Sequence, residues 1–221
     1  RPRIERPEGK PNPWWMWIGG VLGALFIFGN AALVPQIGTG LTVVAGPTAV
    51  GKGTIVAELR RRHPELFISV SATTRSPRPG EVDGVHYHFV SNAQFDRLVE
   101  DGQMLEWALV HGQNRYGTPR GPVQAELDAG RPALLEIDLA GARQVRESMP
   151  EARLVFIAPP SWDELVSRLV GRGTEGESER ERRLTTARVE MDAADEFDRV
   201  IVNDTVARAT DELEGLLGLA G

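Results

Sequence analysis

The sequence of 221 residues contains no cysteine and no internal repeat. The absence of cysteine excludes disulfide bonds and thiolate metal sites, and it is typical of proteins in a reducing compartment. Histidine is also scarce, and the four histidines do not stand at metal-ligand spacings. We therefore expect them to be structural or exposed: His63, His86, His88 and His111.

The chain also lacks an excess of positive charge, because its formal net charge is −6 at pH 7. Residues 1–40 carry +2, which leaves −8 for the rest of the chain. General affinity for DNA or RNA needs a broad basic surface, so an acidic body argues against nucleic acid as a partner. Basic residues within that body are expected to have local roles.

Residues 1–13 are charged and proline-rich, and they are expected to form a flexible arm. Residues 14–34 (WWMWIGGVLGALFIFGNAALV) contain no charged side chain and have about the length that a helix needs to cross a bilayer. Three interpretations stay open. We favour a membrane helix over a signal peptide, and the third is a segment that comes from a neighbouring reading frame or packs on a partner.

A glycine-rich stretch, GPTAVGKGT at residues 46–54, follows the apolar run LTVVA and precedes the helix-compatible IVAELR. This order of strand, loop and helix is the context of a phosphate-binding P-loop. Its backbone N–H groups can surround an anion, and Lys52 adds a full positive charge. Gly53 stands where strict P-loops carry a hydroxyl residue, and Thr54 follows one place later. The stretch predicts a nucleotide-phosphate site.

Strand-like runs alternate with helical patterns from residue 41 to residue 217. PALLEIDL at 132–139 has the continuous apolar character of a buried parallel strand. The alternation predicts an α/β fold, a P-loop-type parallel sheet with helices on both faces. Residues 71–110 are richer in short strands and predict a small inserted subdomain. Ser161 and Glu164 predict a capping box at the start of a helix.

Two arginines three residues apart, Arg75 and Arg78, stand among hydroxyl residues in SATTRSPRPGEVDG. Guanidinium groups in such a pattern suit an oxyanion that takes bidentate partners. Tyr87 can add a phenol hydroxyl to the same anion.

These motifs carry a resemblance to a known family. GPTAVGKGT, SATTRSPRPGEVDGVHYHF, LEWA, YGTP, LEIDLAGA, FIAPPS, RLVGRGTE and VIVND follow one another in the order found in guanylate kinases. The resemblance covers residues 41–217 and excludes residues 1–40. It implies the reaction ATP + GMP ⇌ ADP + GDP with Mg²⁺, a GMP-binding insert at about 71–118 and a mobile lid at about 168–191.

The resemblance also implies roles for individual residues. The GMP phosphate is expected to meet Ser71, Arg75, Arg78, Tyr87 and Tyr116. Guanine is expected to meet Glu106, Thr118 and Asp138. A carboxylate such as that of Glu106 accepts from the N1–H and the exocyclic amine of guanine, a pattern that adenine does not present.

ATP is expected at the P-loop and the lid. The implied ATP-binding residues are Gly46, Pro47, Thr48, Ala49, Val50, Gly51, Lys52, Gly53, Thr54, Arg168, Arg172 and Asn203. Phosphoryl transfer chiefly requires positioning and neutralisation of charge, so the implied catalytic residues are Lys52, Arg75, Arg172 and Arg183. Mg²⁺ is expected to bind through the phosphates and water, with Thr54 or Asp138 as further candidates.

Two rival interpretations remain. A guanylate-kinase-like scaffold that binds phosphorylated peptides would typically lack the P-loop lysine and the lid arginines, which this chain keeps. A kinase for another nucleoside monophosphate is disfavoured by Glu106 and Thr118. The enzyme is expected in the cytoplasm, with tethering through residues 14–34 left open. Basic residues before that segment would place the rest of the chain outside the cytoplasm unless an earlier span precedes Arg1.

Overall fold

The structure is a computed structural model that describes residues 40–110, 113–170 and 177–219. All of them belong to the unit Gly38–Gly221. The sequence segment 14–34 and the lid residue Arg172 lie outside the described residues. Within the described ranges, no helix has the length and apolar character that crossing a membrane requires.

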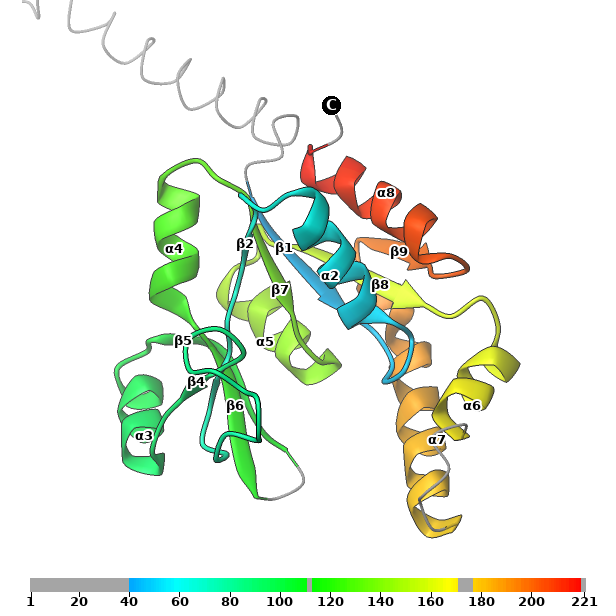
Figure 1. The fold of residues 1–221 in the computed structure, drawn as a ribbon, viewed down its shortest axis with the longest axis horizontal. Helices are drawn as coiled ribbons and strands as arrows, with labels where there is room; N and C mark the ends of the chain where they lie inside the picture. Colours follow the sequence, from blue (N-terminus) through cyan, green and yellow to red (C-terminus); the bar gives the residue numbers. More distant parts are fainter. Residues whose placement is uncertain (1–39, 111–112, 171–176, 220–221) are drawn as a thin grey trace, which may run out of the picture. The chain divides into compact units, whose positions relative to one another are not determined.

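A five-stranded sheet, in which all neighbouring strands are parallel, forms the centre of this unit (Figure 1). Its order is β2-β7-β1-β8-β9. The strands are β1 (Leu41–Ala45), β2 (Phe67–Ile68), β7 (Ala133–Glu136), β8 (Arg153–Ala158) and β9 (Arg199–Val202). Every side chain of β1 is buried. The predicted strand at 132–139 is shorter in the structure, because the Asp138 carboxylate caps the next helix.

Helices cover both faces of this sheet. They are α2 (Lys52–Arg62) and α8 (Val206–Leu217) on one face, and α4 (Arg120–Asp128) and α5 (Leu139–Ser148) on the other. On the first face Leu59 and Leu213 pack with Val44, and on the second Val145 packs with Val43. The alternating side chains of β1 therefore join two apolar cores. The predicted α/β fold class is confirmed.

A second sheet is built from the chain between β2 and α4, in the order β4-β3-β6-β5. Its elements are β3 (Ala72–Thr73), β4 (His88–Phe89), α3 (Asn92–Glu100), β5 (Met104–Val110) and β6 (Asn114–Pro119). Strand β6 was not predicted, since NRYGTP contains glycine and proline and lacks apolar alternation. It forms through antiparallel pairing with β5, its neighbour in the sequence, and with the more distant β3, and the local pattern of the segment does not reveal this pairing.

Two further helices, α6 (Trp162–Val170) and α7 (Glu177–Asp192), pack through Leu165, Leu169 and Ala187, and η1 (Ala193–Glu196) follows. One of the two hydrogen bonds of the predicted capping box forms at α6: the Ser161 hydroxyl accepts from the Glu164 N–H at 3.2 Å. The Glu164 carboxylate pairs with Arg168. A full capping box forms at α3, where it was not predicted.

Candidate active site

The loop between β1 and α2 has a backbone that only particular residues can adopt. Gly46 has φ 146°, and a Cβ there would lie 2.3 Å from the carbonyl oxygen of Ile157. Gly51, the N-cap of α2, has φ 95°. Both positions therefore require glycine, one for close approach to β8 and both for backbone conformation. The loop leads directly into the N-terminus of α2, where unpaired N–H groups favour an anion.

Two distant side chains hold this loop through a single acceptor. The carbonyl oxygen of Val50 accepts from Asn203 Nδ2 at 2.8 Å and from Arg168 Nη1 at 3.3 Å. Asn203 is buried, and a Cβ on Gly51 would lie 2.5 Å from its Nδ2. Both residues predicted for ATP thus support the P-loop in this structure. Their predicted contacts with ATP stay predictions.

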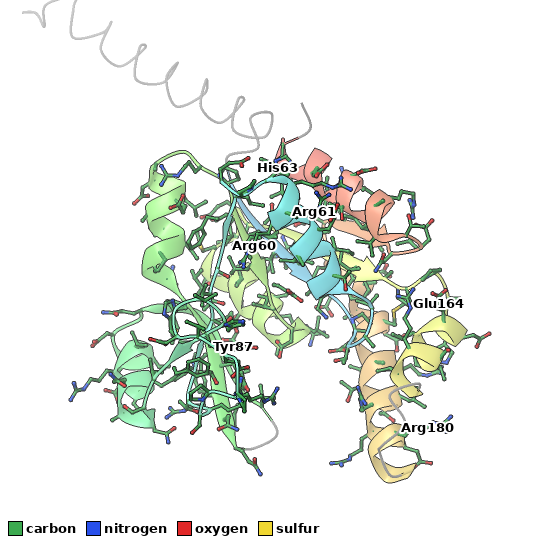
Figure 2. The ribbon with its side chains drawn as sticks, viewed as in Figure 1. Arg60, Arg61, His63, Tyr87, Glu164 and Arg180 are labelled. Atoms are coloured by element: carbon green, nitrogen blue, oxygen red, sulfur yellow. The ribbon has the colours of Figure 1, made fainter. Side chains whose placement is uncertain are left out.

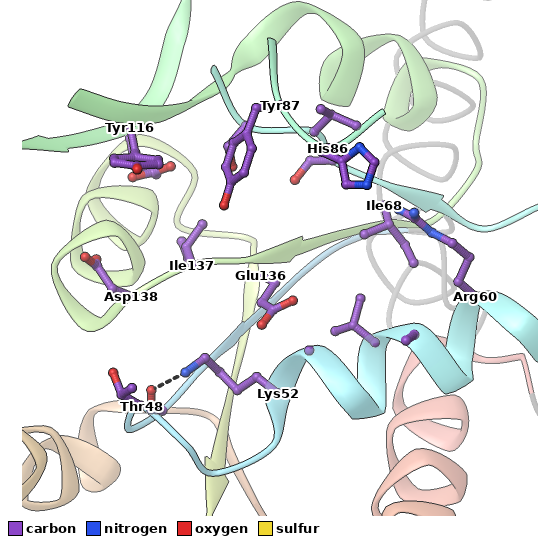
Figure 3. Close-up of a pocket in the computed structure, with 18 of the residues that line it drawn as sticks. Thr48, Lys52, Arg60, Ile68, His86, Tyr87, Tyr116, Glu136, Ile137 and Asp138 are labelled. Carbon is purple, nitrogen blue, oxygen red and sulfur yellow. Dashed lines mark hydrogen bonds between the residues drawn. The ribbon is translucent and has the colours of Figure 1, made fainter. Parts of the chain in front are cut away.

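Lys52 turns its amine back over the loop (Figure 3). The amine donates to the carbonyl oxygens of Gly46, at 2.6 Å, and Pro47, at 3.1 Å. Burial lowers the pKa of Lys52, and the negative charges of Glu136, Glu190 and Asp138 oppose that shift. The acids therefore favour the charged amine. An incoming phosphate offers the same amine a stronger partner than backbone carbonyls.

A cavity of about 620 Å³ extends from the P-loop to the inserted sheet. Nine predicted site residues line it: Gly46, Thr48, Lys52, Gly53, Ser71, Tyr87, Glu106, Tyr116 and Asp138. Figure 3 shows Lys52 and Glu136 on one side, and Tyr87 and Tyr116 across from them. The structure thus brings the predicted ATP and GMP regions to one continuous space. Thr54 is exposed and is not among the described residues that line the cavity.

Glu106 lies near the start of β5 and is only 6% exposed. Its Oε1 accepts from the Thr118 hydroxyl at 2.7 Å, across the β5–β6 pair. Burial raises the pKa of Glu106 to about 7; the hydrogen bond from Thr118 opposes this shift and the charge of Asp138 adds to it. A carboxylate held in this way can accept two hydrogen bonds from a planar base when it is ionised.

The helix α5 shapes the space beside Glu106. Asp138, at the N-cap, accepts from the Gly141 N–H at 2.7 Å. A Cβ on Gly141 would lie 2.8 Å from Glu106 Oε2, so glycine makes room for that carboxylate. Sequence reasoning included Gly141 in a motif without assigning it a role. The contact depends on packing between α5 and β5, which the local sequence does not show.

The predicted phosphate-binding side chains form a cluster around two tyrosines. Arg75 Nε donates to the Tyr116 hydroxyl at 3.1 Å, and its guanidinium lies 5.4 Å from the centre of the Tyr87 ring. Burial raises the pKa of Tyr87, which keeps its hydroxyl protonated and able to donate. Arg78 is exposed at the edge of this cluster.

Two acidic residues at the site were missed in the sequence. Glu81 pairs with Arg75 through both carboxylate oxygens, at 2.9 and 2.8 Å. Glu190, near the end of α7, accepts a backbone hydrogen bond from Thr48 and lines the cavity beside Lys52. Burial raises the pKa of Glu190. The GEVDG motif could have indicated Glu81, whereas Glu190 depends on how α7 packs.

The described lid arginines, Arg168 and Arg183, are not among the residues that line the cavity. Arg168 contacts the P-loop, Arg183 lies on α7, and Arg172 lies outside the described residues. Figure 2 shows Arg180 near the start of α7, far from Tyr87 on the inserted sheet. Arg168 therefore lies at the P-loop, whereas Arg75 lies with the tyrosines of the inserted subdomain.

The structure also bears on Mg²⁺. In the part of the chain that the structure describes, no group of three or more His, Cys, Asp or Glu side chains is arranged to hold a metal ion. Glu136, Asp138 and Glu190 nevertheless surround Lys52 closely enough to act on its charge. Carboxylates beside a phosphate site fit a hard cation that is held mainly by phosphate oxygens and water.

A parallel α/β sheet, a P-loop at the carboxyl end of β1 and a cavity shared with an inserted sheet define a P-loop nucleotide kinase. Comparison with known proteins specifies the family. Residues 39–219 match the family model described as "Guanylate kinase". The chain belongs to the guanylate kinase family.

Individual relatives agree with this assignment. The guanylate kinase of Leifsonia xyli subsp. xyli is 62% identical over 177 residues, which are 80% of this chain and 70% of that protein. The guanylate kinase of Streptomyces coelicolor is 59% identical over 188 residues, 85% of this chain and 95% of that protein. The crystal structure of guanylate kinase from Anaplasma phagocytophilum matches this structure with a TM-score of 0.64 and a sequence identity of 33%. The match covers 80% of this chain and 84% of that one.

The N-terminal region has a match of its own. Residues 3–50 match a family model described as "Putative inner membrane exporter, YdcZ". This match includes β1 and the first part of the P-loop, which the guanylate kinase match also covers.

Proposed function

We propose that this protein transfers the γ-phosphoryl group of ATP to GMP and thereby produces ADP and GDP. The observation that carries this proposal is the shared cavity, which has Lys52 and the P-loop at one end and Glu106 at the other. One space that accepts two nucleotides end to end suits direct transfer between them. The attacking oxygen belongs to the GMP phosphate, so the reaction needs no separate catalytic base.

The P-loop residues 46–54 would hold the ATP phosphates, and Lys52 would follow the transferred group. Its present contacts with Gly46 and Pro47 are consistent with this role, because a phosphate can replace both carbonyls. Arg168, Arg172, Arg183 and Asn203 are proposed for the ATP side. Their cationic members would neutralise the charge that spreads over the phosphates during transfer.

The GMP phosphate would bind at the tyrosine cluster, where Ser71, Tyr87 and Tyr116 line the cavity, and Arg75 and Arg78 would supply its positive charge. Guanine would bind at Glu106, with Thr118 and Asp138. The buried Thr118–Glu106 pair supports this role, because a carboxylate held in place can accept from both the N1–H and the exocyclic amine of guanine. Adenine does not present these two donors side by side.

Mg²⁺ is proposed as the cofactor. Glu136, Asp138 and Glu190 would contact it through water, and when bound it would offset the negative charge of the phosphates. The carboxylates also supply a reason for a cation, since without one they would repel the phosphates that Lys52 attracts.

The function is tested by mixing the full chain with ATP, Mg²⁺ and one nucleoside monophosphate, and following nucleoside diphosphate formation. We expect turnover with GMP and much lower kcat/KM with AMP, CMP or UMP. A protein without turnover that binds phosphorylated peptides would be the scaffold alternative. Equal turnover with CMP or UMP would contradict guanine recognition.

We propose that the kinase domain works in the cytoplasm and that residues 14–34 tether it to a membrane. The uncharged stretch and the match of residues 3–50 to an inner membrane exporter family support the tether. Fractionation of the full chain and of a chain lacking residues 1–38 tests it. The full chain is expected in the membrane fraction and the shortened chain in the supernatant; recovery of both in the supernatant would contradict the tether.

A further inference from the structure

Arg75 is held by hydrogen bonds from within the inserted subdomain. Its Nη1 donates to Ser76 O at 2.7 Å and to Glu81 Oε2 at 2.9 Å, its Nη2 donates to Glu81 Oε1 at 2.8 Å, and its Nε donates to the Tyr116 hydroxyl. These contacts use four of the five N–H groups of a guanidinium. Both side chains of the ion pair are largely shielded, with Arg75 13% and Glu81 17% exposed.

Glu81 also organises the loop that carries the second arginine. Its Oε2 accepts from the Arg78 N–H at 2.6 Å, and its own N–H donates to Arg78 O at 3.0 Å. These bonds close the turn 78–81 in both directions. The hydrogen bonds from Arg75 and from the Arg78 backbone lower the pKa of Glu81 to about 2, so the carboxylate stays charged at any working pH.

The chain of contacts ends at the cavity. Tyr116 lines the cavity, whereas Arg75 is not among the described residues that line it. Because the Tyr116 oxygen accepts from Arg75 Nε, its own proton is left to donate elsewhere. An acceptor in the cavity, such as a phosphate oxygen, is a suitable partner for that proton.

We propose that Glu81 is a positioning residue for the phosphate of the acceptor nucleotide: it fixes Arg75, and through Arg75 it orients the Tyr116 hydroxyl toward the cavity. This inference rests on the proposed function of the same site. Arginine has large rotamer freedom, and a bidentate carboxylate removes it before the phosphate arrives. Glu81 itself does not touch the substrate.

The test replaces Glu81 with glutamine, which keeps its size and removes its charge. We expect KM for GMP to rise about tenfold, with kcat at saturating GMP and KM for ATP within about twofold of wild type. Guanosine lacks the phosphate, so its inhibition constant should not change. A structural defect would weaken guanosine and GMP together, and this comparison separates the two.

Two further variants complete the experiment. Glu81→Asp keeps the charge at a shorter reach, and its KM for GMP should lie between those of wild type and Glu81→Gln. Asp83→Asn removes a carboxylate from the same loop, where Asp83 Oδ1 accepts only from the Phe89 N–H among the contacts that the structure describes, at 2.9 Å. This variant should keep KM for GMP within about twofold.

The inference is overturned if KM for GMP stays unchanged or falls in Glu81→Gln, since a fall would mean that Glu81 competes with the phosphate for Arg75. It is also overturned if guanosine binding weakens in step with GMP binding. Wild-type turnover of GMP in the same assay shows whether the proposed function holds, so failure of the function and failure of the inference give different results.

Discussion

The two ends of the cavity are built in different ways. The P-loop end is a continuous stretch, in which two glycines and a helix N-terminus create the anion site. The end proposed for guanine is assembled from three separate elements, β5, β6 and α5, which contribute Glu106, Thr118 and Asp138. We expect activity to depend on the charge of one residue, Lys52, at the P-loop end. At the other end we expect it to depend on the shape and the protonation of several residues. The comparison predicts that mutations at the two ends separate catalysis from recognition.

The largest expected effect is that of Lys52→Ala. We expect kcat for GDP formation to fall on the order of a thousandfold or more, because the charge that follows the transferred phosphate is lost. Steady-state assays at saturating ATP and GMP measure this. Arg61→Ala, on the same helix but with a side chain that is 70% exposed, is the matched control and should stay within about twofold. A similar loss in both variants would mean that α2 itself is disrupted.

The second effect, at the other end, is that of Glu106→Gln. The amide cannot accept from both guanine donors, so kcat/KM for GMP should fall about 100-fold while KM for ATP stays unchanged. Glu100→Gln, at an exposed position at the end of α3, is the control. If kcat/KM for GMP survives in Glu106→Gln, another group reads the base.

The third effect is a pH dependence of base recognition. The pKa of Glu106 is raised to about 7, and guanine donors need the ionised carboxylate. Binding is therefore fully present well above pH 7, falls to half near pH 7, and is lost as the pH falls further and the carboxyl takes up a proton. Between pH 8 and pH 6 the inhibition constant of guanosine should rise roughly tenfold. Guanosine avoids titration of the phosphate, and the same series with Glu106→Gln should be flat. A flat wild-type series would contradict the role of Glu106.

The smallest effect is that of Gly141→Ala, which sharpens the comparison because Gly141 lies beside Glu106, at the end proposed for guanine. Its new Cβ would lie 2.8 Å from Glu106 Oε2, so KM for GMP should rise about threefold to tenfold with KM for ATP unchanged. Gly215→Ala, in α8, has no atom within 4 Å of the new Cβ and should alter neither KM. Equal KM values in the two variants would show that the carboxylate has room to move.

The same contrast explains how much the sequence could reveal. The P-loop, the buried strands at 41–45 and 153–158 and the fold class followed from local patterns, because glycine conformation and continuous apolar runs act over a few residues. Strand β6 depends on its pairing with β5 and β3, the Glu81–Arg75 pair on how the loop 75–81 turns back on itself, and the place of Gly141 beside Glu106 on packing of α5 against β5. Local patterns do not contain that information. The resemblance to a family supplied candidate residues at the guanine end that physical reasoning alone left open.

Calorimetric titration of GMP into the Lys52→Ala and Glu106→Gln proteins tests the separation of the two ends most directly. The account predicts that Lys52→Ala binds GMP with a Kd within about twofold of wild type while Glu106→Gln binds about 100-fold more weakly. Wild-type affinity in Glu106→Gln, or a matching loss in Lys52→Ala, would contradict it.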